Sequence, residues 1–421
     1  MAITNSSGRR RFLLLAILAM AAASSFANAA PVIDFTKLPD SITTNISSFP
    51  VTGRSSSTVY VNGAAVAPDA IGNDFFSVVG LKAGANAITL RTGNKTYTKT
   101  VEYDPSYSTA GKELVYANVK YKLPGGAGES GTIVANITDR AFIGVLRGIK
   151  VNAITRDGGE IITNTGQRWS TATNRYTGRT LPNFTGSRPI FSIDGSRAYY
   201  NYWVADMAAN SIVANLSESI FSGDILPDGS RVITYNAMLD TATNAITKIK
   251  NVSYGSGIKV DPTGKHAWNV SYGSTIGTLK INTIEEDDFT PAKQHRISDY
   301  AGDVVFSPAS QYAYVGAYGN TYYGGGEISI FNTENLKKTG KLKIFGAQSL
   351  AISQDTGKIY ASAFRTRLSG ETKGSKSNRG IVEITPKKNS LKISAVYFVS
   401  LLSTTNEPYY GTNNIFYKQA N

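Results

Sequence analysis

Short apolar runs separated by tight polar turns recur along the last two-thirds of the chain. The clearest copy covers residues 304–315, where two apolar runs flank a Ser-Pro-Ala-Ser turn. Such a pattern predicts two antiparallel strands joined by a tight turn. Aligned copies place their turns 37, 34, 35, 46 and 47 residues apart, at Gly158, Gly195, Gly229, Gly264, Ser310 and Gly357. A spacing of about 40 residues with four strands per unit indicates the blade of a β-propeller.

The second half of each unit repeats as well. An Asp/Asn-Thr turn that ends in Asn occurs at residues 240–244 and 332–335, with a further version at 382–389. Asn and Asp side chains cap such turns by bonding their own backbone. A half-unit at residues 131–139 precedes the first full copy, and the chain ends in another apolar run after residue 414. We therefore expect residues 114–146 to complete a blade begun by the C-terminal strand, which predicts seven blades.

This pattern resembles the YVTN-repeat family of seven-bladed propellers over roughly residues 110–421, and the nearest match to its motif is at residues 313–317. Most copies lack the full Tyr-Val-x-Asn motif. The family includes surface-layer proteins, periplasmic binding proteins and noncatalytic parts of complexes, while related propellers are lactonases or dehydrogenase subunits. The resemblance therefore implies a fold more firmly than an activity.

An N-terminal part with a different pattern precedes the repeats. Asn62-Gly63 between two alternating runs predicts a hairpin, and further strands are expected at residues 75–79, 87–91 and 97–103. The motifs V-N-G-x-x-V, F-x-V and L-x-x-G-x-N-x-I resemble bacterial immunoglobulin-like modules. We expect an all-β protein with an immunoglobulin-like β-sandwich at residues 30–105 and a seven-bladed β-propeller at residues 106–421.

Residues 1–29 have the three parts of a secretory signal peptide: Arg9 to Arg11, an apolar stretch, and Ala27-Asn28-Ala29. We expect an exported protein, periplasmic, secreted or at the cell surface, without a transmembrane anchor. Whether export follows the general secretory or the twin-arginine route stays open. The chain has no cysteine, which excludes disulfides and thiolate chemistry, and its net charge of +13 favours anionic partners or serves solubility.

Two long loops between second and third strands carry the most distinctive side chains. The first is rich in glycine and tyrosine, and the second holds five cations against one acid. Aromatic rings stack on sugars or bases, and cations pair with phosphate or carboxylate, so this rim is a candidate ligand site unless both loops are merely solvated. Its candidate residues are Tyr318, Tyr322, Tyr323, Arg365, Arg367 and Lys373.

The central mouth of the propeller is a second candidate site, because the innermost strands begin there. Its polar candidates are Arg188, Asp224, Lys259, Asp303 and Gln348. His266 and His295 are expected in different blades, so a metal cluster or triad would depend on one histidine alone. We expect no metal and no cofactor.

These features favour an exported noncatalytic binding or scaffold protein that uses a propeller face to bind an anionic polymer, a glycan or a protein. Nucleic acid is an open possibility without support from a motif. Two alternatives stay open: a hydrolase or lyase of the lactonase kind acting at the central mouth, and a structural subunit of a periplasmic complex.

Overall fold

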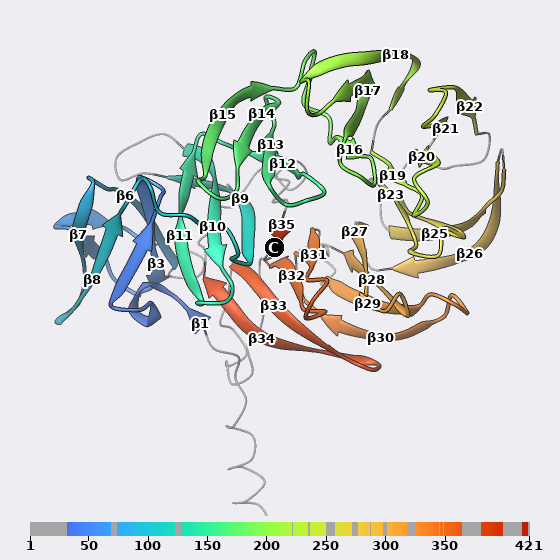
Figure 1. Ribbon diagram of the computed structural model, residues 1–421. Coiled ribbons are helices and arrows are strands. Elements are labelled where there is room, and N and C mark those ends of the chain that lie inside the picture. The colour runs from blue at the N-terminus through green and yellow to red at the C-terminus, as the bar shows by residue number, and fades with distance from the viewer. Residues whose placement is uncertain are drawn as a thin grey trace, which may run out of the picture.

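A computed structural model describes residues 32–68, 74–122, 128–220, 222–234, 236–249, 257–271, 277–286, 288–297, 301–317, 326–344, 346–347, 349–363, 380–398 and 415–419. Within these ranges the regular elements are strands, apart from the short 3-10 helix η1 (Phe35–Lys37). Figure 1 shows a ring of sheets with a small blue sandwich beside it. The predicted signal peptide, residues 1–29, lies outside the described residues.

The sandwich has two sheets. One has the order β2-β8-β7-β4-β5, and the other pairs β3 with β6. Their bounds are β2 (Ser41–Thr44), β3 (Ser48–Arg54), β4 (Val59–Val61), β5 (Ala64–Val66), β6 (Asp74–Gly80), β7 (Gly84–Thr92) and β8 (Lys95–Tyr103). Asn62 and Gly63 have φ values of 48° and 82°, as a tight primed turn requires. The predicted hairpin is therefore confirmed, while membership of the immunoglobulin-like modules stays a prediction.

Seven sheets follow in the described part of the chain after residue 106, and within each of them the strands beyond that residue pair antiparallel. The first contains β9 (Leu114–Lys122), β10 (Gly128–Asn136), β11 (Ala141–Arg147) and β35 (Ile415–Lys418); the next contain β12 (Val151–Ile154), β13 (Glu160–Thr163), β14 (Gln167–Ser170) and β15 (Arg175–Thr180), then β16 (Ile190–Phe191), β17 (Arg197–Asp206) and β18 (Ser211–Ile220), then β19 (Asp224–Ile225), β20 (Arg231–Ile233), β21 (Ala237–Asp240) and β22 (Ile246–Lys248). The last three contain β23 (Gly257–Val260), β24 (His266–Ser271), β25 (Gly277–Ile284) and β26 (Phe289–Ile297), then β27 (Ala301–Phe306), β28 (Tyr312–Ala317), β29 (Glu327–Asn332) and β30 (Lys338–Lys343), then β31 (Leu350–Ile352), β32 (Ile359–Ala363), β33 (Gly380–Lys387) and β34 (Ser390–Phe398).

Their arrangement around a centre makes this part of the protein a β-propeller (Figure 1). The predicted all-β propeller preceded by a sandwich is therefore confirmed. The number of blades stays a prediction, with which the seven sheets agree.

The repeated turn between the first two strands of the second to seventh sheets has one backbone requirement. Five of the six aligned positions are glycines with φ between 67° and 77°, and the sixth, Ser310, has φ 59°. Left-handed backbone disfavours residues with a Cβ, which explains why the pattern so often ends in glycine. The regular spacing of these glycines in the sequence therefore follows from the left-handed backbone that each of these turns needs.

The third of these sheets has three strands, one fewer than the sheets on either side of it. Its middle strand, β17, contains a turn: Asn201 has a left-handed φ of 48°, and the Met207 amide donates to the Ser196 carbonyl at 2.9 Å. The equivalent bond in the next sheet joins Thr241 to Ser230 across a second and a third strand. The chain therefore reverses at Asn201, and β17 supplies both the second and third strands of its blade.

Ring closure takes the predicted form. β35 pairs antiparallel with β9, with Phe416 opposite Tyr116, so the C-terminal strand is the innermost strand of the first sheet. β35 lies near the centre of the ring in Figure 1. A contact that the sequence did not reveal lies at the outer edge of the last sheet, where β1 (Val32–Ile33) adds in parallel to β34. The chain thus reaches the last blade before it forms the sandwich.

The sandwich and the propeller share one hydrophobic core. A continuous cluster includes Phe49 and Val101 of the sandwich together with Val119 and Phe142 of the propeller. Gly144 of β11 allows the close approach, because a Cβ there would lie 2.6 Å from the Ile46 Cβ. The two parts therefore meet through direct packing rather than through a free linker.

Candidate binding site between the sandwich and the propeller

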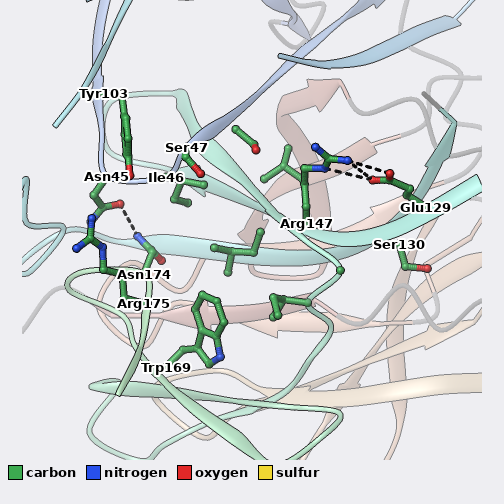
Figure 2. Close-up of a pocket in the computed structure, with 15 residues that line it drawn as sticks. Asn45, Ile46, Ser47, Tyr103, Glu129, Ser130, Arg147, Trp169, Asn174 and Arg175 are labelled. Atoms are coloured by element: carbon green, nitrogen blue, oxygen red, sulfur yellow. Dashed lines mark hydrogen bonds and ion pairs between the residues drawn. The ribbon is translucent and has the colours of Figure 1, made fainter. Parts of the chain in front are cut away.

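A pocket of about 680 Å³ lies where the sandwich meets the first two propeller sheets. The residues 45–48 and Tyr103 of the sandwich form one wall, and residues 129–130 and 145–149 of the first sheet form another. Trp169, Asn174 and Arg175 come from the second sheet. Figure 2 shows the Trp169 ring below the pocket, with the Glu129–Arg147 pair on one side and Arg175 on the other.

A buried polar network holds these walls together. The Asn174 side-chain amide donates to the Asn45 Oδ1 at 3.0 Å, and the Tyr116 hydroxyl donates to the Asn174 Oδ1 at 3.0 Å. Asn45 in turn donates to the carbonyls of Tyr107 and Ala172 at 2.9 and 3.1 Å. Because buried amides and hydroxyls are costly to leave unpaired, this network favours a single relative placement of the two domains.

Asn174 is suited to its place by its backbone. It ends the turn between β14 and β15 with φ 51°, a conformation that asparagine tolerates better than most residues. Asn174, a turn residue of one propeller unit, therefore also joins the sandwich to the propeller.

The charged pair on one side of the pocket is bidentate. Arg147 donates from Nη2 to the Glu129 Oε1 at 2.9 Å and from Nε to Oε2 at 3.2 Å. These hydrogen bonds lower the pKa of Glu129, so its carboxyl group is ionised at neutral pH. Tyr121 donates to the same carboxylate, and burial raises its pKa to about 12. Both charged side chains stay partly exposed, at 46% for Arg147 and 34% for Glu129.

The pocket combines an aromatic surface with polar groups at its rim. Trp169 is half-buried against the core, and its indole Nε1 donates to Gln167 at 3.2 Å. An indole face stacks on sugar rings, while guanidinium and carboxylate groups bind pairs of hydroxyls or an acid group. With Arg147 neutralised by Glu129, Arg175 supplies a net positive charge. The arrangement can therefore bind a polar ring that carries hydroxyl or acidic groups.

The central-mouth candidates are partly brought together. Asp224 Oδ2 lies 4.0 Å from the Lys259 Nζ and accepts from the Val260 amide at 3.2 Å, so it connects two neighbouring innermost strands. Asp303 accepts from the Val304 amide at 3.0 Å. Arg188 lies over the Phe416 ring of β35, 5.6 Å from its centroid. Asp224 and Arg188 contact adjoining strands, and Asp303 bonds its own strand.

The remaining candidates lie outside the described residues. These are Tyr318, Tyr322, Tyr323, Arg365, Arg367, Lys373 and Gln348. The predicted basic, tyrosine-bearing rim therefore stays a prediction.

The placement of the two histidines was wrong. His266 lies on β24 and His295 on β26, which belong to the same sheet. Both histidines follow the turn at Gly264 and precede the turn at Ser310, and the three strands after a turn belong to the same blade, so both positions fall inside one unit. His266 contacts Asp261 at 2.8 Å and His295 contacts the Leu336 carbonyl at 2.7 Å. Across the described ranges, no three His, Cys, Asp or Glu side chains group in a way that could hold a metal ion.

Sequence reasoning missed the pocket, because its walls come from residues more than a hundred positions apart. Trp169 offered one signal, since the chain has only three tryptophans and this one precedes a repeat turn. That signal does not reveal which surface the ring faces.

No protein-family model matches the chain, and a search of curated proteins finds no significant match. Among solved structures, hydrazine synthase of Kuenenia stuttgartiensis is 15% identical, with a TM-score of 0.43 over 55% of this chain and 75% of that one. TolB of Acinetobacter baumannii is 14% identical, with a TM-score of 0.38 over 72% and 85% of the two chains. The dihydro-heme d1 dehydrogenase NirN is 13% identical, with a TM-score of 0.40 over 74% and 77%.

Such distant similarities carry no argument about activity or ligand.

No helix in the described ranges is long and apolar enough to cross a membrane.

Proposed function

We propose that this protein is an exported, noncatalytic binding protein that holds a glycan in the pocket between its sandwich and its propeller. One observation carries the proposal: the Trp169 ring, the Glu129–Arg147 pair and Arg175 line a single pocket of about 680 Å³. Aromatic stacking combined with bidentate polar groups suits a sugar ring. Arg175 favours a sugar that carries an acidic group.

The buried network around Asn174 supports a binding role. It fixes the walls before any ligand arrives, and a site that is already ordered loses less conformational entropy when it binds. The export prediction, drawn from residues 1–29, fits a ligand of the cell surface or its surroundings.

Glycan-array binding followed by calorimetry tests the proposal. Trp169→Leu should weaken binding by about 10- to 100-fold, because loss of aromatic stacking costs about 1–3 kcal/mol. Arg175→Gln should weaken binding of acidic sugars more than that of neutral ones. Tyr202→Ala is a matched control, since Tyr202 is 49% exposed and lies outside the pocket.

The outcome also separates the alternatives. A bound sugar recovered unchanged supports a noncatalytic role, whereas turnover that depends on Asp224 or Asp303 would support the lactonase-like alternative. Absence of any glycan binding, or binding that Trp169→Leu leaves unchanged, would contradict the proposal. Copurification of a stoichiometric protein partner would instead support the structural-subunit alternative.

A further inference from the structure

A second surface, on the last two sheets of the ring, gathers positive charge. It consists of six exposed lysines on β30, just before it, and on the turn between β33 and β34, and we call it the β30 basic edge. Its members are Lys337, Lys338, Lys341, Lys343, Lys387 and Lys388. The described acids on the strands and turns that carry or pair with these lysines are Glu327 of β29, Glu334 of the turn before β30, and Glu383 of β33, which pairs with Lys358. The edge therefore carries a clear positive excess.

The two groups of lysines lie together because two blades touch closely. A Cβ at Gly340 of β30 would lie 2.3 Å from the Asn389 carbonyl oxygen, so the β33–β34 turn packs directly on β30. Figure 1 shows β30 and β34 as neighbouring orange strands at the edge of the ring. Lys387 and Lys388 of that turn are thereby held beside the lysines of β30.

A nearly buried carboxylate positions part of this edge. Glu327 has a side chain only 9% exposed and lies 2.5 Å from the Lys338 Nζ and 3.4 Å from the Lys341 Nζ. Burial opposes its ionisation, but the bonds from Lys338 and Ser329 outweigh that effect and its pKa is lowered. Lys343 lies directly opposite Glu327 in the strand pairing. One ionised acid therefore anchors two ammonium groups without neutralising the edge.

The apolar and aromatic content of β30 indicates which kind of partner the β30 basic edge binds. Leu342, between the lysines, packs against the core, so this strand offers a bilayer no apolar anchor. Its described residues include no aromatic side chain on which bases could stack. Side chains two positions apart on a strand lie on the same face, about 7 Å from each other. A row of lysines with this spacing can pair with several negative charges that repeat along an extended polymer.

We propose that the β30 basic edge docks an extended acidic polysaccharide through its carboxylate groups. This site is independent of the proposed pocket, because it shares no residue with it. Each exposed ion pair is weak, so affinity depends on several lysines acting together and decreases with salt.

The test measures binding of the full chain to immobilised polygalacturonate at low and raised salt. The variant K337Q/K343Q/K387Q/K388Q removes four lysines that form no ion pair with a described carboxylate, and it should bind about tenfold more weakly. The control K37Q/K82Q/K95Q/K265Q removes the same charge from exposed lysines elsewhere and should bind as the unmodified protein does. Thermal unfolding of both variants checks that they fold.

Equal loss in both variants would overturn the proposal, because net charge alone would then explain binding. So would failure of the unmodified protein to bind polygalacturonate, or tighter binding to anionic lipid vesicles or to DNA. Trp169→Leu separates the two sites: it removes any polygalacturonate binding through the pocket, and the binding that remains should still fall about tenfold when K337Q/K343Q/K387Q/K388Q is added.

Discussion

Removing the Asn174 side chain should weaken the join between the sandwich and the propeller. In Asn174→Ala, the Tyr116 hydroxyl loses its acceptor and the Asn45 Oδ1 loses its donor, and both of these residues are buried. Each unpaired buried group costs about 1–3 kcal/mol. Alanine with φ 51° adds strain of about 1–2 kcal/mol. The free energy of unfolding should therefore fall by about 3–8 kcal/mol.

Asn174→Gly is the matched variant, because it removes the same side chain without the left-handed strain. It should be about 1 kcal/mol less destabilising than Asn174→Ala. Urea unfolding followed by circular dichroism and tryptophan fluorescence measures both. The double variant Tyr116→Phe with Asn174→Gly should lose less stability than the sum of the losses in the two single variants, because both substitutions remove the same hydrogen bond. A loss below about 1 kcal/mol for Asn174→Gly, or strict additivity in the double variant, would refute this reasoning.

Three further predictions concern the propeller itself. Ser310→Gly should stabilise the protein by about 0.5–1 kcal/mol in urea unfolding by relieving the left-handed turn, while Gly229→Ser should destabilise it, and a loss in Ser310→Gly would contradict this. Gly316→Ala should lower the melting temperature, because its Cβ would lie 2.1 Å from the Ala347 carbonyl oxygen, and an unchanged melting temperature would show that β28 can shift. Burial lowers the pKa of Lys418 below the ordinary lysine value of 10.5. As pH rises, Lys418 therefore loses its proton in the folded protein at a lower pH than in the unfolded chain. Between the folded pKa and 10.5 the unfolded chain binds more protons, so the free energy of unfolding rises with pH. Lys418→Met should remove that rise in denaturant unfolding at successive pH values, and an unchanged pH slope would contradict it.

The propeller was predictable because its units are locally encoded. The glycines of the repeated turns mark backbone that a Cβ disfavours, and their spacing measures one blade. Closure by β35 was predictable too, since the half-unit upstream of the first full copy required a strand from the end of the chain. The histidine placement was wrong because a blade continues for three strands past its turn, here as far as β26, which carries His295.

The candidate site depended on contacts that no local pattern carries. Asn45, Glu129 and Trp169 line one pocket, but each belongs to a different sheet or connection and each looks ordinary in its own segment. The same holds for β1, which has two residues and adds to a strand more than three hundred and fifty positions away.

The sequence alone therefore determined the all-β class, the repeating blade and the closure of the ring, because turn chemistry and alternating hydrophobicity act over a few residues. The tertiary structure decided that the sandwich packs against the propeller, that Asn174 joins them, and that lysines of two blades share one edge. These features arise from packing between units, where a close approach such as that at Gly144 or Gly340 depends on both partners at once.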